Sequence, residues 1–319
     1  MEVFQHAATQ MLILFTIVFL GAVARKKHLM NDDFDALLSR LVMTVTLPGM
    51  ILDSVLSNTN LPSTETIFLM LGYSTIVYII VCILAVLLGR FVYRGISKAA
   101  KGAHAFLIAF GNTGFIGFAV LSSIFGADSV LYGAVYNIPY NIFMFSVGLI
   151  FISSTGSNKD ERHGLKFQAK MIAKQLVSPV LISCFVAMFL AIFGVTDSGF
   201  VGQTCNLLGQ MTVPAAMLII GSSLAKMPLK DMFKDKWSYL TTALRLIIVP
   251  LLLFYVCGLF IHDSYLLAIV VVISAMPAAS SGIMMCLAYG GDSRTMARGT
   301  FLTTLFSLIT LPLIALIVV

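Results

Sequence analysis

The amino-acid sequence predicts an all-α polytopic membrane protein with ten transmembrane helices, arranged as two inverted five-helix repeats. Three observations support this prediction: an apolar composition, a one-sided distribution of basic residues, and a weak similarity between the two halves of the chain. Of the 319 residues, 59% are hydrophobic and only 11% are charged, and the mean hydropathy is +0.99. Soluble domains carry about 25% charged residues, and they could not bury so much apolar surface. A water-soluble fold is therefore excluded.

Ten apolar stretches follow one another along the chain, separated by short polar or turn-rich segments. At about 20 residues each, ten spans leave no room for a separate soluble domain. In order, the predicted spans cover residues 7–24, 36–56, 65–88, 104–125, 129–153, 171–193, 201–224, 238–260, 264–288 and 300–319. We expect the first to be a helix rather than a signal peptide, because its bases follow the apolar stretch instead of preceding it.

The basic residues predict how the spans are oriented. Eighteen of the 20 Lys and Arg residues fall in the odd-numbered loops, counting Lys174 at the start of the sixth span with the loop before it, and the other two, Arg40 and Arg245, fall within spans. The positive-inside rule then places the odd loops in the cytoplasm and both termini outside. We expect an integral protein of a cell membrane, either a plasma membrane or a bacterial inner membrane, with lipid as its surrounding partner. The bases form no single basic face with interleaved aromatic residues, so no nucleic-acid partner is expected.

The two halves of the chain resemble each other at a shift of about 165 residues. Phe125-Gly126-Ala127-Asp128 matches Tyr289-Gly290-Gly291-Asp292. Residues 43–56 loosely match 211–224, and a displacement of two residues within this match aligns Pro48 with Pro214. Because five spans are an odd number, the two repeats must face opposite ways, as they do in many secondary transporters. This predicts a first repeat over 1–155, a cytoplasmic basic linker over 156–170 and a second repeat over 171–319. Chance similarity between apolar helices is the alternative.

Corresponding positions of the fourth and ninth spans carry residues that interrupt helices. The fourth span contains Gly111, Asn112, Thr113 and Gly114, and the ninth contains Pro277, Ala278, Ser280 and Ser281. An opened helix leaves unpaired backbone groups, which a membrane protein tolerates only around a cavity or inside protein. Paired interruptions of this kind point to a substrate site near the middle of the membrane, where free N–H groups suit an anion. Close packing at glycine-rich contacts is the alternative explanation.

Other polar residues inside spans are weaker candidates. Asn137 and Asn141 lie four residues apart on one face of the fifth span and are candidates for substrate binding or for hydrogen bonds between helices. Asp53 is the acidic residue within a span and is a candidate for ion coupling, with helix capping or a pair at the outer surface as equal alternatives. Arg40 and Arg245 are expected to extend towards the membrane surface rather than to contact substrate. The five cysteines lie in apolar runs without metal-ligand spacing, so no metal site or disulfide is predicted.

The sequence resembles the auxin efflux carrier family, which includes plant auxin exporters and bacterial malate or malonate permeases. The resemblance covers nearly the whole chain and is most specific over residues 275–313, which begin AMPAASSGIMMCLAYGGD; residues 111–117 (GNTGFIG) and 218–224 (LIIGSSL) support it. Two positions depart from the family pattern. Ala119 stands where the fourth span usually has proline, and Ser178 stands where asparagine usually precedes the proline of the sixth span, which makes auxin itself a less suitable substrate.

The resemblance implies an architecture like that of sodium/proton antiporters and bile-acid transporters. Spans 1, 2, 6 and 7 would form a scaffold, through which a homodimer could form. Spans 3–5 and 8–10 would form a mobile transport domain, with broken spans 4 and 9 crossing at the substrate site. Coupling to protons or sodium is compatible with this architecture, and no other cofactor is expected.

The predicted function is secondary transport of a small organic carboxylate anion by an elevator-type alternating-access mechanism. A substrate-gated channel or membrane sensor of the same fold is the alternative. An enzyme is not expected, because Asp53 lacks a second carboxylate in another span and the sequence contains no nucleotide-binding loop.

Overall fold

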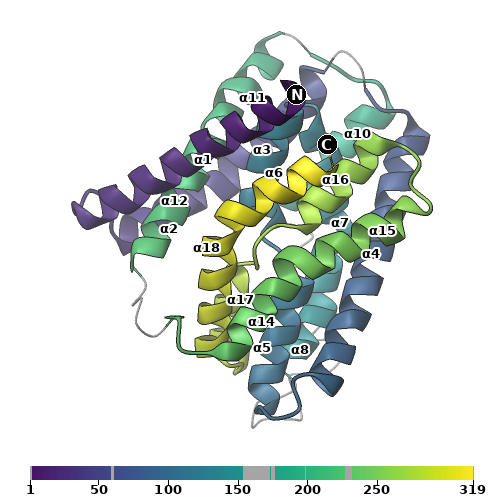
Figure 1. Ribbon diagram of the computed structural model, residues 1–319. Coiled ribbons are helices and arrows are strands. Elements are labelled where there is room, and N and C mark those ends of the chain that lie inside the picture. Colours follow the sequence, from purple (N-terminus) through teal and green to yellow (C-terminus); the bar gives the residue numbers. More distant parts are fainter. Residues whose placement is uncertain are drawn as a thin grey trace.

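The computed structural model describes residues 2–58, 61–153, 173, 177–197, 199–226 and 232–318. Throughout these residues the regular structure is helical, and the sole β-type pairing is an isolated bridge between Gly111 and Ala278 (Figure 1). The predicted linker over 156–170 and the first residues of the predicted span 171–193 lie outside the described residues.

The first half of the chain forms helices joined by short turns and, within three of the spans, by wide π-helical turns. They are α1 (Glu2–Lys26), α2 (Asp32–Leu41), α3 (Leu47–Leu56), α4 (Thr64–Phe91), α5 (Lys98–Ala109), α6 (Phe118–Phe125), α7 (Ser129–Phe143) and α8 (Leu149–Ser153). The second half forms α10 (Pro179–Ile192), α11 (Phe200–Gln210), α12 (Thr212–Lys226), α14 (Lys236–Ala243), α15 (Val249–Gly258), α16 (Ser264–Ser274), α17 (Ser281–Tyr289) and α18 (Ser293–Val318).

Six helical segments of the described chain are long and apolar enough to cross a membrane. They are Asp32–Leu56, Thr64–Phe91, Ser129–Ser153, Phe200–Lys226, Lys236–Gly258 and Ser293–Val318. Three shorter apolar helices, Thr113–Phe125, Pro179–Ile192 and Ser264–Ser274, fall in the fourth, sixth and ninth predicted spans. The prediction of an all-helical membrane protein is therefore confirmed.

Two of the π-helical turns lie directly before prolines. The turn over Val42–Thr46 precedes Pro48, and the turn over Leu244–Ile248 precedes Pro250. Proline has no N–H to donate, and its ring collides with the carbonyl of the preceding turn. A wider turn relieves this collision, so each of these spans continues past its proline instead of ending there.

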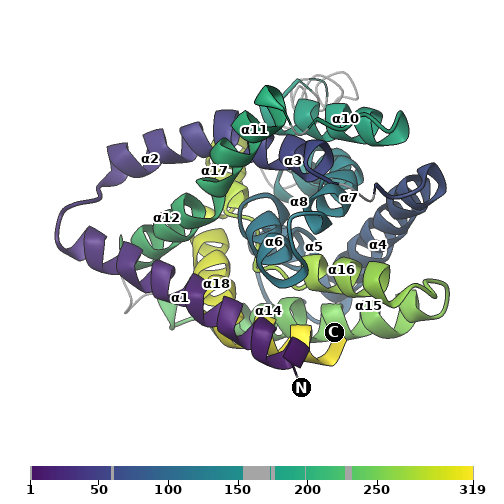
Figure 2. The ribbon, with the colours of Figure 1, turned by 90° about the horizontal axis from the view of Figure 1, so that it is seen from above.

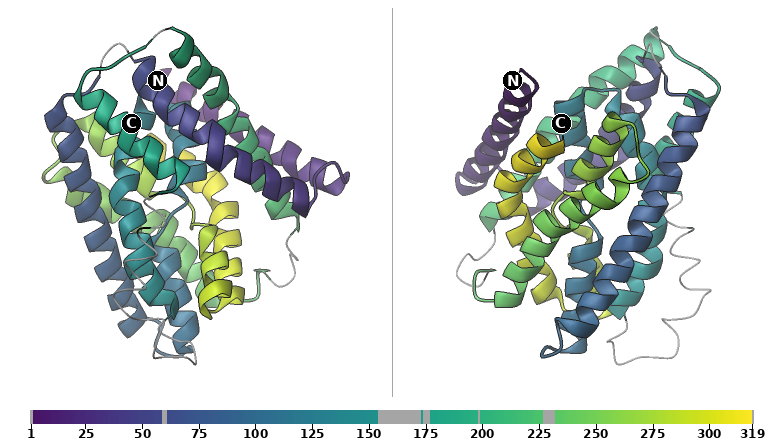
Figure 3. Two further views of the ribbon diagram at one scale, coloured as in Figure 1. Left: turned by 180° about the vertical axis from the view of Figure 1, so that it is seen from behind. Right: turned by 45° about the vertical axis from the view of Figure 1, so that its right-hand side comes forward.

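We divide the described helices into two groups, although α10 packs against both α3 and α7 and so lies at the boundary between them. The flanking group comprises α1–α3 and α10–α12, and the central group comprises α4–α8 and α14–α18. Asp53 and Asn206, Thr46 and Thr212, and Asp35 and Ser222 are paired within the flanking group. In every view α1 and α4 lie on opposite sides of the molecule, and from above α1, α2 and α12 lie on one side with α4, α15 and α16 on the other (Figures 2 and 3).

Close backbone approach holds the flanking group together. Helices α1 and α12 pack along each other, and a Cβ at Gly21 would overlap the carbonyl oxygen of Leu218. A Cβ at Gly221 would likewise overlap the carbonyl oxygen of Val18. In lipid, the hydrophobic effect does not drive helices together, and van der Waals contact takes its place. Small residues strengthen this contact because they let the two backbones approach closely.

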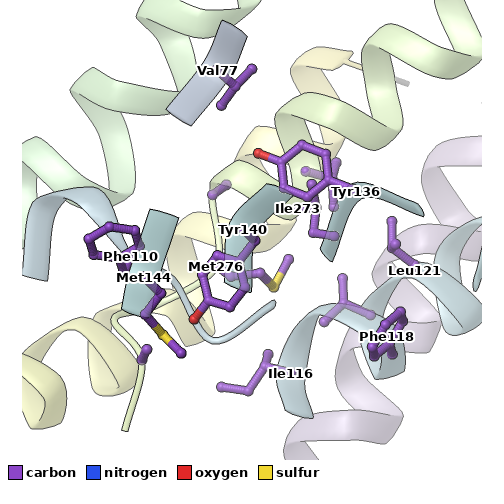
Figure 4. Close-up of a cluster of buried hydrophobic side chains, with 14 of the residues drawn as sticks. Val77, Phe110, Ile116, Phe118, Leu121, Tyr136, Tyr140, Met144, Ile273 and Met276 are labelled. Atoms are coloured by element: carbon purple, nitrogen blue, oxygen red, sulfur yellow. The ribbon is translucent and has the colours of Figure 1, made fainter. Parts of the chain in front are cut away.

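The central group has its own buried core, built around the interruptions of the fourth and ninth spans. Phe110, Tyr136, Tyr140, Ile273 and Met276 are all nearly inaccessible to solvent and meet there (Figure 4). The Tyr140 hydroxyl donates to the carbonyl of Gly111 at 2.8 Å, and the Tyr136 hydroxyl lies 2.9 Å from that of Ser274. These two tyrosines therefore fix the interrupted segments against α7.

Candidate functional site

Two helices of the central group are interrupted, and the interruptions pair with each other. Helix α5 ends at Ala109 and helical structure resumes at Thr113, whereas α16 ends at Ser274 and α17 begins at Ser281. The N–H of Asn112 donates to the carbonyl of Pro277 at 2.6 Å, and the N–H of Ala279 donates to the carbonyl of Phe110 at 3.0 Å. Each interruption thus satisfies backbone groups of the other, as burial requires. The shorter one lies in the span that has Ala119 in place of proline.

Arg245 lies directly behind these paired segments. Only 2% of it is exposed, and its Nε donates to the carbonyl of Met276 at 3.0 Å. Its Nη1 donates to the carbonyls of Ile108 at 2.9 Å and Ala109 at 3.4 Å. The expectation that Arg245 extends to the membrane surface is wrong. The carbonyls at the end of α5 and beyond the end of α16 carry partial negative charge, so they supply the acceptors that the guanidinium would otherwise find at the surface.

A cavity of about 240 Å³ separates the two interruptions from the flanking group. Asn112, Ala278, Ser280 and Thr300 line it from the central group. The facing wall comes from α2 and α12, and it is mainly apolar, with the hydroxyls of Ser39 and Ser223 among Ile219, Ile220 and Leu224. Among the described residues, no charged side chain lines this cavity, and the nearest buried charge in that part of the chain is Arg245, which lies behind the cavity wall.

Asn112 and Thr300 each carry a polar group at or near the cavity that the contacts between described residues do not use. The Oδ1 atom of Asn112 accepts from the N–H of Phe115 at 3.2 Å and so caps the helical turn that starts at Thr113. Its Nδ2 atom is left as a donor at the cavity wall. The hydroxyl of Thr300 is buried and has no hydrogen-bond partner in the part of the chain that the structure describes, although Thr300 lines the same cavity. A buried hydroxyl without a partner costs about 1–3 kcal/mol, and a bound polar ligand would remove that cost.

The remaining sequence-predicted residues occupy different positions. The buried Thr113 hydroxyl donates to Oδ1 of Asn137 at 2.8 Å. Asn137 and Asn141 donate back to carbonyls of α7 through Nδ2, at 2.9 and 2.7 Å. The hydroxyl of Ser281 is 3.7 Å from the sulfur of Met144. These contacts join α7 and the turn after it to the interrupted segments, so these four residues are placed to support the cavity wall rather than to form it.

Gly114 and Pro277 contribute through the backbone. No atom lies within 4 Å of the place where a Cβ of Gly114 would be, so there is open space beside it. Pro277 supplies the carbonyl that Asn112 binds. Neither residue is among those that line the cavity.

Asp53 lies in the flanking group, away from the cavity lining. Its Oδ1 atom accepts from the hydroxyl of Ser57 at 2.6 Å and its Oδ2 atom from Nδ2 of Asn206 at 3.1 Å. It therefore ties α3 to α11. Burial, together with the nearby charge of Asp53, raises the pKa of Asp128 in the turn before α7.

Sequence reasoning missed Thr300, Ser39 and Ser223 and underrated Arg245. Thr300 belongs to a helix that also carries Thr303, Thr304 and Ser307, so composition alone could not single it out. Among the described residues, no cluster of three acidic, histidine or cysteine side chains is suited to bind a metal ion. The five cysteines are buried and not joined in disulfides.

The fold and the cavity together define a polytopic membrane protein with a cavity of about 240 Å³ between two groups of helices. A family model described as "Membrane transport protein" matches residues 6–315, and the chain belongs to this family, the auxin efflux carrier family. An uncharacterized transporter of Methanocaldococcus jannaschii is 26% identical over 309 residues, covering 95% of this chain and 96% of that protein. The uncharacterized transporter YfdV of Escherichia coli is 27% identical over 308 residues, covering 95% of both chains.

Proposed function

We propose that this protein is a secondary transporter for a small organic carboxylate anion, with its substrate site in the cavity at the two interrupted helices. The observation that carries the proposal is the arrangement around this cavity. The Nδ2 donor of Asn112 lies at its wall, the unpaired hydroxyl of Thr300 lies just beneath its lining, and a buried arginine lies behind it. Ligand sites for drug-sized molecules usually enclose about 300–1,000 Å³, so the smaller volume here suits a small solute.

Charge favours an anion over a cation or a neutral solute. The described residues of the cavity lining include no carboxylate, and the Nδ2 donor of Asn112 is one of their free groups. The guanidinium of Arg245 is always protonated, and charges interact strongly across the low-dielectric interior of a membrane protein. Neutral donors can bind a carboxylate directly, while the arginine contributes its charge from one residue layer behind.

The contact between the two helix groups supports a moving site. Beyond the main cavity, a void of about 20 Å³ lies in the same seam, lined mainly by apolar side chains such as Leu14, Val18, Val120, Met217 and Leu311. Sliding past an apolar surface breaks no hydrogen bonds. We therefore assign the flanking group as the scaffold and the central group as the transport domain of an elevator-type mechanism.

The proposed inverted repeats have support in one contact of the flanking group. The register that aligns Pro48 with Pro214 also aligns Thr46 with Thr212. The hydroxyls of these two threonines lie 3.0 Å apart in the buried interior. Equivalent residues of two repeats meet where a two-fold axis passes between them, and inverted repeats in transporters are related by such an axis in the membrane plane.

The cavity lies towards the basic ends of the helices that line it. Ser39 precedes Arg40, Thr300 follows Arg298 by two residues, and Ser223 precedes Lys226 by three. With the orientation expected from the positive-inside rule, the site faces the cytoplasm in this conformation.

Counterflow in proteoliposomes tests this function. Vesicles loaded with an unlabelled carboxylate should accumulate the same labelled carboxylate transiently, because a carrier exchanges its substrate. A channel gives no such accumulation, and a sensor gives no flux. Repeating the assay with imposed proton or sodium gradients shows whether transport is coupled to either ion. Absence of saturable flux for a panel of small mono- and dicarboxylates would rule the proposed function out.

A further inference from the structure

We propose that Arg245 gives the empty substrate site one uncompensated positive charge, so that the membrane potential sets which way the empty site faces, and that a monovalent anion cancels this charge on binding. This inference rests on the proposed function, because it needs a site that moves across the membrane. It adds the valence of the substrate and the step on which voltage acts.

The first support is where the arginine is held. Arg245 is in the middle of the span Lys236–Gly258, and its guanidinium is bound by carbonyls from two other helical segments, α5 and the interruption after α16. A Cβ at Gly111 would overlap Nη2 of Arg245, which places the guanidinium directly against the residue before Asn112. All these contacts belong to the central group. The charge must therefore travel with that group.

The second support is the absence of a counter-ion for Arg245 among the described residues. The ion pairs found there lie in the flanking group, where Arg25 and Lys226 bind Asp32, and Arg25 also reaches Asp35. The ring hydroxyls of the buried tyrosines around Arg245 are neutral. Acidic residues of the central group, such as Asp128, Asp235, Asp263 and Asp292, lie in turns at the helix ends, where water and ions reach them.

Voltage then acts unequally on the two halves of a transport cycle. With the inside of the cell negative, the empty site carries a positive charge and is drawn towards the cytoplasm. A site holding a monovalent anion is neutral and crosses without regard to voltage. In one full cycle the loaded, neutral site moves outward and the empty, positively charged site returns inward. The net result is one negative charge exported, so the charges balance. The potential therefore favours export, and the cytoplasm-facing cavity described above is the resting state of the empty site.

A divalent anion fits this arrangement poorly. Its second charge would find no partner among the described residues, because those that line the cavity are uncharged and Arg245 can compensate one charge only. An unpaired charge in the membrane interior is costly. A monocarboxylate is therefore the expected class of substrate.

The test measures how the empty protein responds to voltage. Phe200 and Leu259 are both highly exposed, lie at the ends of α11 and α15, and belong to different groups. Cysteines placed there can carry a fluorescent donor and acceptor, since the native cysteines are buried. The two orientations of the site should give two distances between the labels. In proteoliposomes with valinomycin and no carboxylate, a tenfold potassium gradient should shift the ratio of the populations at these two distances. This population ratio should change by about tenfold if the charge crosses the whole membrane field, and by a smaller factor if the charge crosses only part of it.

Variants and anions complete the test. Arg245→Lys should keep the voltage response, Arg245→Gln should lose it, and Arg40→Gln, which changes an exposed arginine of the flanking group, should leave it intact. Adding pyruvate, lactate or acetate should suppress the response, whereas malonate should not. If two label distances occur but the ratio of their populations does not change with the potassium gradient, this inference is overturned and the proposed carrier function stands. A single distance under all conditions overturns both. A full response that persists with every monocarboxylate overturns the monovalent-anion assignment.

Discussion

Gly111 and Arg245 occupy complementary space: Nη2 of Arg245 fills the position where a side chain on residue 111 would begin. The missing Cβ lets the guanidinium reach the carbonyls of Ile108 and Ala109 and of Met276 at the same time. A glycine at one interruption thus allows a single cation to hold both interruptions in place.

Replacing Gly111 with alanine should therefore destabilise the protein. The new methyl group would displace the guanidinium and weaken hydrogen bonds that involve a charged donor, each worth about 1.5–3 kcal/mol. We expect a loss of about 2–4 kcal/mol, measured as a lower unfolding temperature in detergent. Gly114→Ala is the matched control, because its Cβ would enter open space. Equal unfolding temperatures for the two variants would disprove the role assigned to Arg245.

Asn112→Asp separates the cap from the substrate contact. Aspartate keeps an oxygen that can accept from the N–H of Phe115, so the fold should survive, but it replaces the Nδ2 donor with a negative charge. We expect carboxylate affinity to fall by about a hundredfold or more, since a hydrogen bond to a charged ligand is lost and repulsion is added. Gln210→Glu makes the same chemical change on the exposed surface of α11 and should bind normally. Unchanged binding by Asn112→Asp would place the site elsewhere.

Thr300 and Thr303 offer a matched pair in α18. Thr300→Val removes a hydroxyl that has no partner, so stability should hold or rise by about 1 kcal/mol while carboxylate binding weakens. Thr303→Val removes a hydroxyl that accepts from the N–H of Ala278 at 3.1 Å and donates to Gly299 at 2.7 Å. That variant should lose about 1–3 kcal/mol of stability. Thermal unfolding and substrate titration of both proteins check this prediction, and it fails if Thr300→Val proves the less stable.

Asp197 should make stability depend on pH in the turn before α11. Hydrogen bonds from the N–H groups of Gly199 and Gly202, at 2.8 and 3.1 Å, lower the pKa of Asp197. Its contribution is therefore present above the pKa of the unfolded chain and is lost as pH falls through the lower folded value. Relative to Asp197→Asn, the wild type should be more stable at neutral pH and should lose that advantage progressively as pH falls below the ordinary aspartate pKa of about 3.9. A difference in unfolding temperature that stays constant with pH would contradict this.

The sequence was sufficient to locate the interruptions but not to find what holds them. Glycine, proline and small polar residues interrupt helices by local chemistry, so residues 111–114 and 277–281 could be recognised without a structure. The side chain of Arg245 was predicted in the wrong place, because hydropathy alone suggests that an arginine within a span extends to the membrane surface. Only the tertiary structure brings the carbonyls of Ile108 and Met276 to one point.

The same limit applies to the polar side chains around the cavity. Asn137 and Asn141 look like site residues in the sequence, but their partners on α7 and at Thr113 engage them in hydrogen bonds. Thr300 looks like any other threonine in an apolar helix. Its significance arises from the lack of a partner, a property that depends on the packing of α18 against the interruptions.

The most direct measurement of the central claim is substrate protection of a cysteine at position 280. Ser280 is exposed within the cavity and the native cysteines are buried, so Ser280→Cys should react with a charged thiol reagent in proteoliposomes. Modification should abolish counterflow of the transported carboxylate, and that carboxylate at saturation should slow the reaction. If modification leaves counterflow intact and proceeds at the same rate with and without the carboxylate, the cavity at the two interrupted helices is not the transport site.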